Sequence, residues 1–241
     1  MTTMEPEQQA VTECKLCGQM FAYEPIWICG KDFGRTLHRH CTGCEARALR
    51  EAGRVKAEAR QAEREASIVA QIPPDLLATD VTRADFKRGL WEIVRQWGPA
   101  GDFWLGIIGG AGLCKTRCMA LLAARVMRDG GRVVWTTANR IKDASADRGH
   151  RERGVSLLAR EHLEDCLHAG WLFVDDIGKN EWGPAFESQF FKILDHRKNY
   201  RLPVVFSSNA HPSALSQMIT PLNAGPIIGR LLDRTTLLDL M

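Results

Sequence analysis

The chain has 241 residues and a formal net charge of +3, from 32 Lys and Arg against 29 Asp and Glu. That length can bury one sizeable core and leaves material for a small second unit. The excess of positive charge is too small to indicate nucleic-acid binding, so any affinity for DNA must come from local patches. No apolar run approaches the ~20 residues of a membrane span, and no secretion signal is evident, so we expect a soluble, cytoplasmic protein without membrane contact.

Cysteine is concentrated near the N-terminus, where five of the eight cysteines lie within the first 44 residues. Four of them form two C-x-x-C pairs: Cys14 with Cys17, and Cys41 with Cys44. Two such pairs can present four thiolates to one tetrahedral Zn²⁺, and the segment between them is too small to fold on an apolar core alone. The sequence therefore predicts a structural zinc site in a zinc-binding segment, 1–45. Unligated cysteines are the alternative, and one ligand could instead come from Cys29, His38 or His40.

A helical linker is predicted over 46–72, because the composition changes at Glu45 to Ala, Glu, Arg and Lys. Small apolar residues recur there at spacings of three and four: Leu49, Ala52, Val55, Ala59, Ala62, Ala66 and Val69. Such a stripe is typical of a helix that docks on a partner, but a solvated connector explains it equally well, because the charges nearly cancel. Pro73-Pro74 ends the helix, so we place the main domain, 73–241, after it.

The main domain begins with an amphipathic helix within 80–97, followed by a glycine-rich stretch. Residues 103–117 read Phe-Trp-Leu-Gly-Ile-Ile-Gly-Gly-Ala-Gly-Leu-Cys-Lys-Thr-Arg, an apolar strand that breaks into glycines before a helix over 119–127. The pattern is close to the phosphate-binding loop G-x-x-x-x-G-K-[ST]. Its backbone N–H groups would surround the phosphates of ATP, from Gly109, Gly110, Ala111, Gly112, Leu113 and Cys114. Lys115 would reach the β- and γ-phosphates, and Thr116 would hold Mg²⁺.

One position departs from the phosphate-loop pattern, because Cys114 stands where the last glycine belongs. Glycine at that point leaves the phosphates room, whereas any Cβ crowds their approach. We therefore expect binding to survive and hydrolysis to be slow and sensitive to thiol reagents. The alternative is that the stretch is only a glycine-rich turn between a strand and a helix.

A β-branched run over 132–137 predicts a buried parallel strand, and a polar stretch over 139–154 predicts a loop. Six basic residues lie in that loop: Arg140, Lys142, Arg148, His150, Arg151 and Arg153. They could contact the phosphates of single-stranded DNA, or they could simply be solvated surface.

A helix is predicted over 155–169, and an apolar strand then ends in Asp175 and Asp176. Beside a phosphate loop, the first carboxylate would orient Mg²⁺ and its waters, and the second would polarise the attacking water. A helix over 184–199 and a strand over 202–207 follow. Asn209 lies at the carboxyl end of that strand, where it could hydrogen-bond the lytic water or the γ-phosphate. With a last short helix over 227–234, strands and helices alternate, which predicts a three-layer, mostly parallel α/β domain.

The order of these motifs resembles the AAA+ (ASCE-type) ATPases of the DnaC-type helicase-loader group, which includes the IstB-type transposition ATPases. The resemblance runs from about Pro73 to the end, and its motifs are 109–116, 172–179, 187–197, 207–209 and 227–231. It implies that Asn209 reads the γ-phosphate and that Arg230 acts in trans on the neighbouring subunit's nucleotide, with Arg234 the weaker candidate. It also implies a homo-oligomer with ATP at its subunit interfaces. A helical lid is common in AAA+ proteins, but little sequence remains for one.

The function implied by this resemblance is the ATP-driven loading of a hexameric replicative helicase onto single-stranded DNA. By analogy, residues 1–70 would contact the helicase. Two rival functions remain open. The protein could be an IstB-type transposition helper that binds duplex DNA, or a nucleotide-gated adaptor that binds ATP, assembles through Arg230 and hardly hydrolyses.

Overall fold

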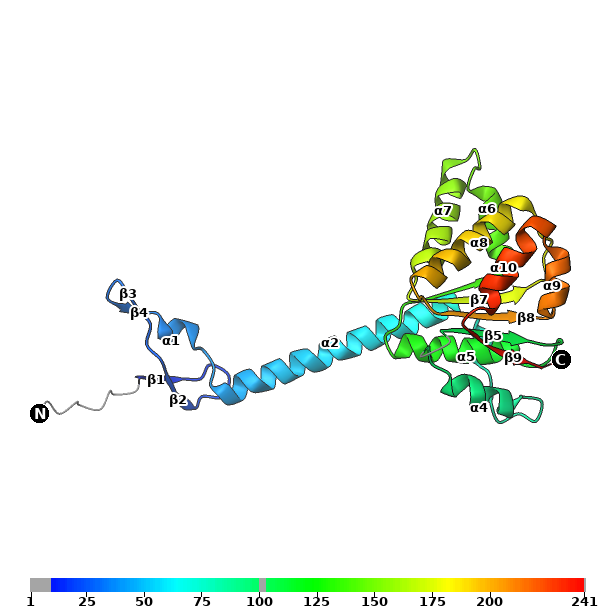
Figure 1. Cartoon of the computed structure of the whole chain (residues 1–241). Coiled ribbons are helices and arrows are strands. Elements are labelled where there is room, and N and C mark those ends of the chain that lie inside the picture. The colour runs from blue at the N-terminus through cyan, green and yellow to red at the C-terminus, as the bar shows by residue number, and fades with distance from the viewer. Residues whose placement is uncertain (1–9, 100–102, 241) are drawn as a thin grey trace, which may run out of the picture. The chain divides into compact units, whose positions relative to one another are not determined.

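The computed structural model describes residues 10–99 and 103–240, and the chain divides into two compact units between Glu63 and Arg64. The first unit contains short elements and most of one long helix: β1 (Ala10–Glu13), β2 (Met20–Tyr23), β3 (Trp27–Ile28), β4 (Lys31–Asp32), α1 (Gly34–Leu37) and α2 (Thr42–Gln71). β1 pairs with β2 and β3 pairs with β4, both antiparallel (Figure 1).

The first unit has almost no apolar core. Within its described residues, the buried positions are Thr12, Cys14, Gly34 and Cys44. Large apolar side chains lie in solvent instead, and Trp27 is 68% exposed. Because so little apolar area is buried, burial alone cannot stabilise this unit, and its folding must depend on the cysteines.

Helix α2 confirms the predicted helical segment, but its apolar stripe is not a packed face. Leu49, Val55 and Val69 are all more than half exposed. The side chains buried at the end of this region are Ile68 and Ile72, which join the core of the second unit. Both explanations of the stripe therefore stay open.

The second unit is built on a five-stranded sheet: β5 (Trp104–Ile108), β6 (Val133–Thr137), β7 (Trp171–Ile177), β8 (Val204–Ser208) and β9 (Thr235–Asp239). The strand order is β6-β7-β8-β5-β9 and every neighbouring pair is parallel. Strand β8 thus separates the glycine-loop strand β5 from the acidic strand β7. This topology confirms the predicted parallel α/β fold. Strand β9 was not predicted, because its residues are only half buried and show no strong strand pattern.

Helices cover both faces of this sheet (Figure 1). They are α3 (Pro74–Leu77), α4 (Arg88–Gln96), α5 (Lys115–Arg128), α6 (Ala138–Asp147), α7 (Arg153–His168), α8 (Pro184–Asn199), α9 (Pro212–Met218) and α10 (Pro221–Leu232). Residues of one strand alternate between two cores: Phe173 packs with α4 and α5, whereas Leu172 and Val174 pack with the helices of the other face. Because both faces are buried, the strands read as continuous apolar runs.

Two predicted element boundaries were wrong. Helix α4 begins only at Arg88, because Asp80 accepts hydrogen bonds from the backbone N–H and hydroxyl of Thr82 and so holds the preceding residues in turns. The predicted loop 139–154 contains α6. The hydroxyl of Thr137 accepts the N–H of Arg140 and caps this helix, while Ile141 is fully buried. A polar composition therefore concealed an amphipathic helix.

Two charged residues of the resemblance motif 187–197 hold the helices together. The buried carboxylate of Glu187 accepts the N–H of Thr220 at 2.9 Å, the hydroxyl of Thr220 at 2.6 Å and the amide of Asn223 at 2.7 Å, so it caps α10. The buried guanidinium of Arg197 donates to the carbonyls of Cys166, Leu167, Ala169 and Pro203. It caps the end of α7. The motif therefore has a structural component beside any catalytic one.

None of the helices in the described part of the chain combines the length and apolar character that crossing a membrane requires.

Candidate functional site

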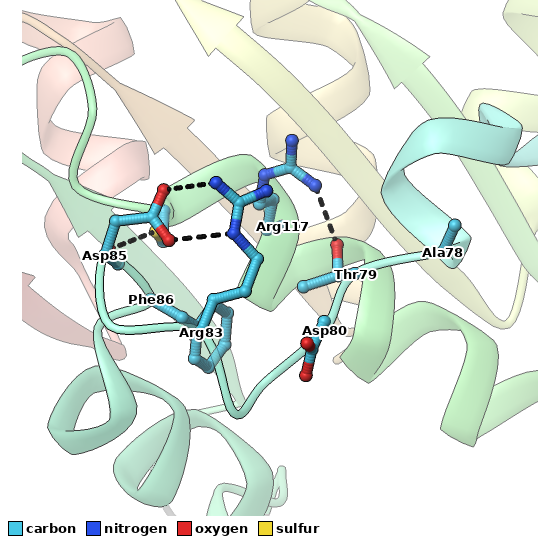
Figure 2. Close-up of a pocket in the computed structure, with 8 residues that line it drawn as sticks. Ala78, Thr79, Asp80, Arg83, Asp85, Phe86 and Arg117 are labelled. Carbon is cyan, nitrogen blue, oxygen red and sulfur yellow. Dashed lines mark hydrogen bonds and ion pairs between the residues drawn. The ribbon is translucent and has the colours of Figure 1, made fainter.

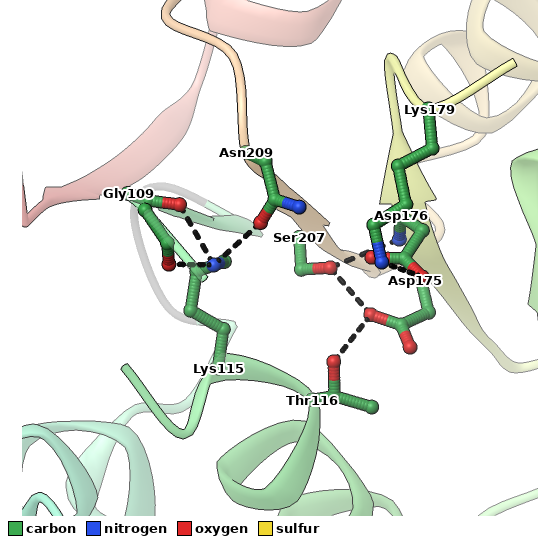
Figure 3. A network of polar contacts seen from close by, with 9 residues as sticks. Gly109, Lys115, Thr116, Asp175, Asp176, Lys179, Ser207 and Asn209 are labelled. Carbon is green, nitrogen blue, oxygen red and sulfur yellow. Dashed lines mark hydrogen bonds and ion pairs between the residues drawn. The ribbon is translucent and has the colours of Figure 1, made fainter. Parts of the chain in front are cut away.

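The glycine loop joins β5 to α5 and places Lys115 at the first position of that helix. Gly109 and Gly112 have left-handed φ values of +152° and +78°, and a Cβ on Gly109 would lie 2.8 Å from Cβ of Leu240. The Lys115 ammonium donates to the carbonyls of Gly109 and Gly110, both at 2.7 Å, and to Oδ1 of Asn209 at 2.8 Å (Figure 3). The cation is therefore held in place by oxygen atoms of the loop and of the segment after β8.

Burial shapes the charge of this lysine. Lys115 is only 6% exposed, and burial lowers the pKa of its ammonium, while Asp176 and Asp175 act in the opposite direction. An ammonium in this position interacts strongly with any anion that enters, because the surroundings are poorly solvated.

A second cluster adjoins this lysine at the ends of β7 and β8. Oδ1 of Asp175 accepts the hydroxyl of Thr116 at 2.9 Å and that of Ser207 at 2.5 Å, and Oγ of Ser207 accepts the N–H of Asp176 at 3.0 Å. Burial raises the pKa of Asp175, although the hydrogen bonds from Ser207 and Thr116 oppose the shift. A hydroxyl beside a carboxylate is the oxygen pair that Mg²⁺ uses. Ser207 had no predicted role; its place at a strand end two residues before Asn209 was the available signal.

A β-bulge lets both acids serve the same site. The pairing of β7 with β8 shifts register between Val174 and Ile177, and Asp176 has a left-handed φ of 60°. In a regular strand, successive side chains point to opposite faces, so Asp175 and Asp176 would diverge. Here Asp175 contacts Thr116, whereas the carboxylate of Asp176 accepts the Lys179 ammonium at 2.7 Å. Lys179 was not predicted to contribute to the site.

An open pocket brings the predicted residues together. Its lining is Leu76, Asp85, Ala111, Gly112, Leu113, Cys114, Lys115, Thr116, Arg117, Asp176, Lys179 and Asn209. Strand order explains this grouping: β5 and β7 lie on either side of β8, so the ends of all three strands meet at one edge of the sheet.

A second pocket adjoins the first at Cys114 and Arg117 (Figure 2). It is formed by the turns before α4, with Ala78, Thr79, Asp80, Arg83, Asp85 and Phe86. Arg117 donates to the hydroxyl of Thr79 at 3.1 Å, and Arg83 pairs with Asp85 at 2.9 Å. The misplaced start of α4 thus creates this pocket, because the turns occupy positions that a longer helix would fill.

Cys114 carries backbone strain. It is the residue before α5 and has φ 59° and ψ 17°, the left-handed region that glycine adopts freely. A residue with a Cβ pays roughly 1–2 kcal/mol there. Its thiol lies 3.7 Å from the carbonyl of Asp85. The sequence pattern has glycine at this position for a backbone reason, in addition to the steric one.

The predicted arginines lie elsewhere. Arg230, on α10, contacts Oδ1 of Asp195 through Nε and Nη2, both at 2.9 Å, and its guanidinium lies 5.6 Å from the ring centroid of Phe191. It does not line the pocket of its own chain. Arg148 donates to Gln189 at 3.2 Å, while Arg151, Arg153 and Arg234 are exposed.

The four predicted cysteines of the first unit form one cluster. The sulfur atoms of Cys14, Cys17, Cys41 and Cys44 all lie within 4.8 Å of one another. Cys29, His38 and His40 do not belong to it. The backbone N–H of Cys41 donates to Sγ of Cys14 at 3.3 Å. Burial raises the pKa of Cys14, but N–H donors, from Cys41 first, outweigh it and lower the pKa to about 6. Four sulfurs at this separation fit one tetrahedral metal ion and leave no open position.

Comparisons with known proteins were made for the whole chain. No family model matches it, and no curated protein sequence matches it. Its structure is similar to that of DnaI, with 18% identity, a TM-score of 0.52, and 72% of this chain and 92% of that chain covered. Domain III of Thermotoga maritima DnaA gives 17% identity, a TM-score of 0.53, and 70% and 68% coverage. The second unit has the AAA+ fold of these replication proteins.

A third similar structure is the replication initiator DnaA bound to AMPPCP and single-stranded DNA, with 17% identity and a TM-score of 0.52. The match covers 65% of this chain and 47% of that chain, so this protein spans about half the length of that DnaA structure.

We predict that Cys114→Gly stabilises the second unit by about 1 kcal/mol, because glycine removes the left-handed strain. The matched control is Cys114→Ala, which removes the thiol but keeps the Cβ and should give no such gain. Chemical denaturation of the two variants measures the difference. Equal stabilities would contradict the assignment of strain to this residue.

Proposed function

We propose that this protein is an ATP-dependent AAA+ ATPase that loads a hexameric replicative helicase onto single-stranded DNA. The observation that carries the ATPase part is the convergence of Lys115, Thr116, Asp175 and Asn209 at one edge of the sheet. The replication part is supported by the similarity to DnaI and DnaA. It goes beyond the fold, because those identities are below 20%.

The residues of the phosphate loop fit a triphosphate. Lys115 would exchange its two carbonyl acceptors for phosphate oxygens, and the N–H groups at the start of α5 would face the same anion. The base and ribose would extend into the pocket formed by the turns before α4, next to Cys114. The site therefore supplies positive charge at one end and a partly apolar wall at the other.

Mg²⁺ fits the pair formed by Thr116 and Asp175, and when bound it would neutralise charge on the phosphates. Ser207 keeps Asp175 oriented toward Thr116. Asp176 would accept the proton of the attacking water, and Asn209 would contact the γ-phosphate. Each of these groups is on the chain's own β7 or β8 edge, so their spacing is fixed by the sheet.

Arg230 would complete the site of a neighbouring subunit in a homo-oligomer. It does not line the pocket of its own chain, and Asp195 and Phe191 hold its guanidinium on the surface of α8. A cation supplied in trans stabilises the charge that develops during phosphoryl transfer.

The four-cysteine cluster would hold one structural Zn²⁺. It accounts for a unit in which few side chains are buried, because metal binding can supply the free energy of folding that an apolar core does not. By analogy with helicase loaders, this unit is also the candidate surface for the helicase.

Arg230→Ala should abolish hydrolysis and leave ATP affinity nearly unchanged, since a group acting in trans stabilises the transition state and not the bound nucleotide. Steady-state turnover and nucleotide titration measure the two effects. Arg234→Ala is the control, and it should retain turnover. Parallel losses of affinity and turnover in Arg230→Ala would mean that Arg230 acts within its own subunit.

Loading of a replicative helicase requires a preference for single-stranded DNA. The triple change of Arg148, Arg151 and Arg153 to Ala should weaken that binding and reduce its salt dependence by roughly 0.7 per lost phosphate contact. Filter binding at several salt concentrations measures both. A preference for duplex DNA would favour the IstB-type transposition function, and tight ATP binding with background turnover would favour the nucleotide-gated adaptor.

Metal analysis of protein purified without chelator should give about one Zn per chain. Cys41→Ser should unfold the first unit and spare ATP binding by the second, because the two units are compact on their own. Cys29→Ser is the matched control and should retain the metal. Protein without zinc, or equal zinc loss in both variants, would disprove the site.

A further inference from the structure

Lys179 is a second lysine in the phosphate pocket, and the proposed mechanism does not yet use it. Its ammonium contacts Oδ2 of Asp176 at 2.7 Å, and both side chains line the same pocket as Lys115 and Asn209 (Figure 3). Lys115 and Lys179 are close enough to interact. Burial is the main cause that lowers the pKa of Lys115, and the charge of Lys179 lowers it further.

The fold does not need this ion pair. The turn after β7 is set by its backbone: Asp176 and Gly178 have φ values of 60° and 92°, and the N–H of Lys179 donates to the carbonyl of Asp176. The side chain of Lys179 is 55% exposed and that of Asp176 is 31% exposed. Ion pairs with this exposure contribute little to stability, and a lysine on a flexible stem can change partners at small cost.

The pair does have a chemical effect on Asp176. While the Lys179 ammonium occupies one carboxylate oxygen, the negative charge that would attract a water proton is largely neutralised. The terminal phosphate of a nucleoside triphosphate carries more negative charge than one carboxylate. It would enter the pocket that both residues line, and so it would compete for the same ammonium.

We propose that Lys179 is a phosphate-responsive residue that leaves Asp176 for the terminal phosphate of bound ATP and thereby frees Asp176 to act as the base. This inference rests on the proposed ATPase function. It couples the arrival of the third phosphate to the release of the carboxylate. A nucleoside diphosphate lacks the group that attracts Lys179, so Asp176 stays paired and the site stays inactive.

The test compares ATP and ADP binding by the full chain carrying Lys179→Met, which keeps the side-chain length and removes the charge. Loss of one charge-assisted contact to the terminal phosphate should weaken ATP binding by about tenfold. ADP affinity should stay within about twofold, and turnover at saturating ATP should fall. Lys179→Arg keeps the charge and should restore the preference for ATP. Lys192→Met, an exposed lysine on α8, is the matched control for loss of one positive charge.

Three outcomes would overturn the inference. They are equal losses of ATP and ADP affinity, an unchanged ratio of the two affinities, and a rise in turnover without a change in that ratio. Thermal melting identifies a folding defect, in which case Lys179→Gln replaces Lys179→Met in the same comparison. If the parent binds and hydrolyses ATP while Lys179→Met behaves like Lys192→Met, only the role of Lys179 fails. If the parent binds neither nucleotide, both proposals fail.

Discussion

The compensation of one buried positive charge organises the second unit. The Lys115 ammonium is nearly inaccessible to water, so the loop carbonyls and Asn209 must take over its solvation. This requirement ties the glycine loop to the end of β8. Ser207, on the same strand, then connects β8 to both acids of β7. The polar site is therefore one connected network across three neighbouring strands, and a shift of β8 would disturb every part of it.

The two units are stabilised by different means. The second unit buries apolar side chains on both faces of its sheet, which is the usual source of stability for a parallel α/β domain. The first unit exposes Trp27 and Ile28 and buries two cysteines. Four sulfurs in one cluster replace the missing core there. Loss of metal and loss of apolar packing should therefore affect different parts of the chain.

Backbone geometry gives the candidate site its particular character. Both Cys114 and Asp176 have left-handed φ values, and each lies where a strand or loop must turn toward the pocket. At Asp176 the bulge directs a carboxylate that a regular strand would send to the opposite face. At Cys114 the same backbone conformation is occupied by a residue that is poorly suited to it. Strain and function coincide at these two positions.

Sequence alone was sufficient for the parallel α/β fold, the residues of the phosphate loop, the acids after the apolar strand and the two cysteine pairs. These features are local, because periodicity and spacing along the chain encode them. Tertiary structure alone decided the contacts of Ser207 and Lys179, the capping roles of Glu187 and Arg197, the helix within 139–154 and the edge strand β9. Each of these depends on which segments become neighbours in space. A hydroxyl or a lysine has the same appearance in the sequence whether it meets solvent or a carboxylate.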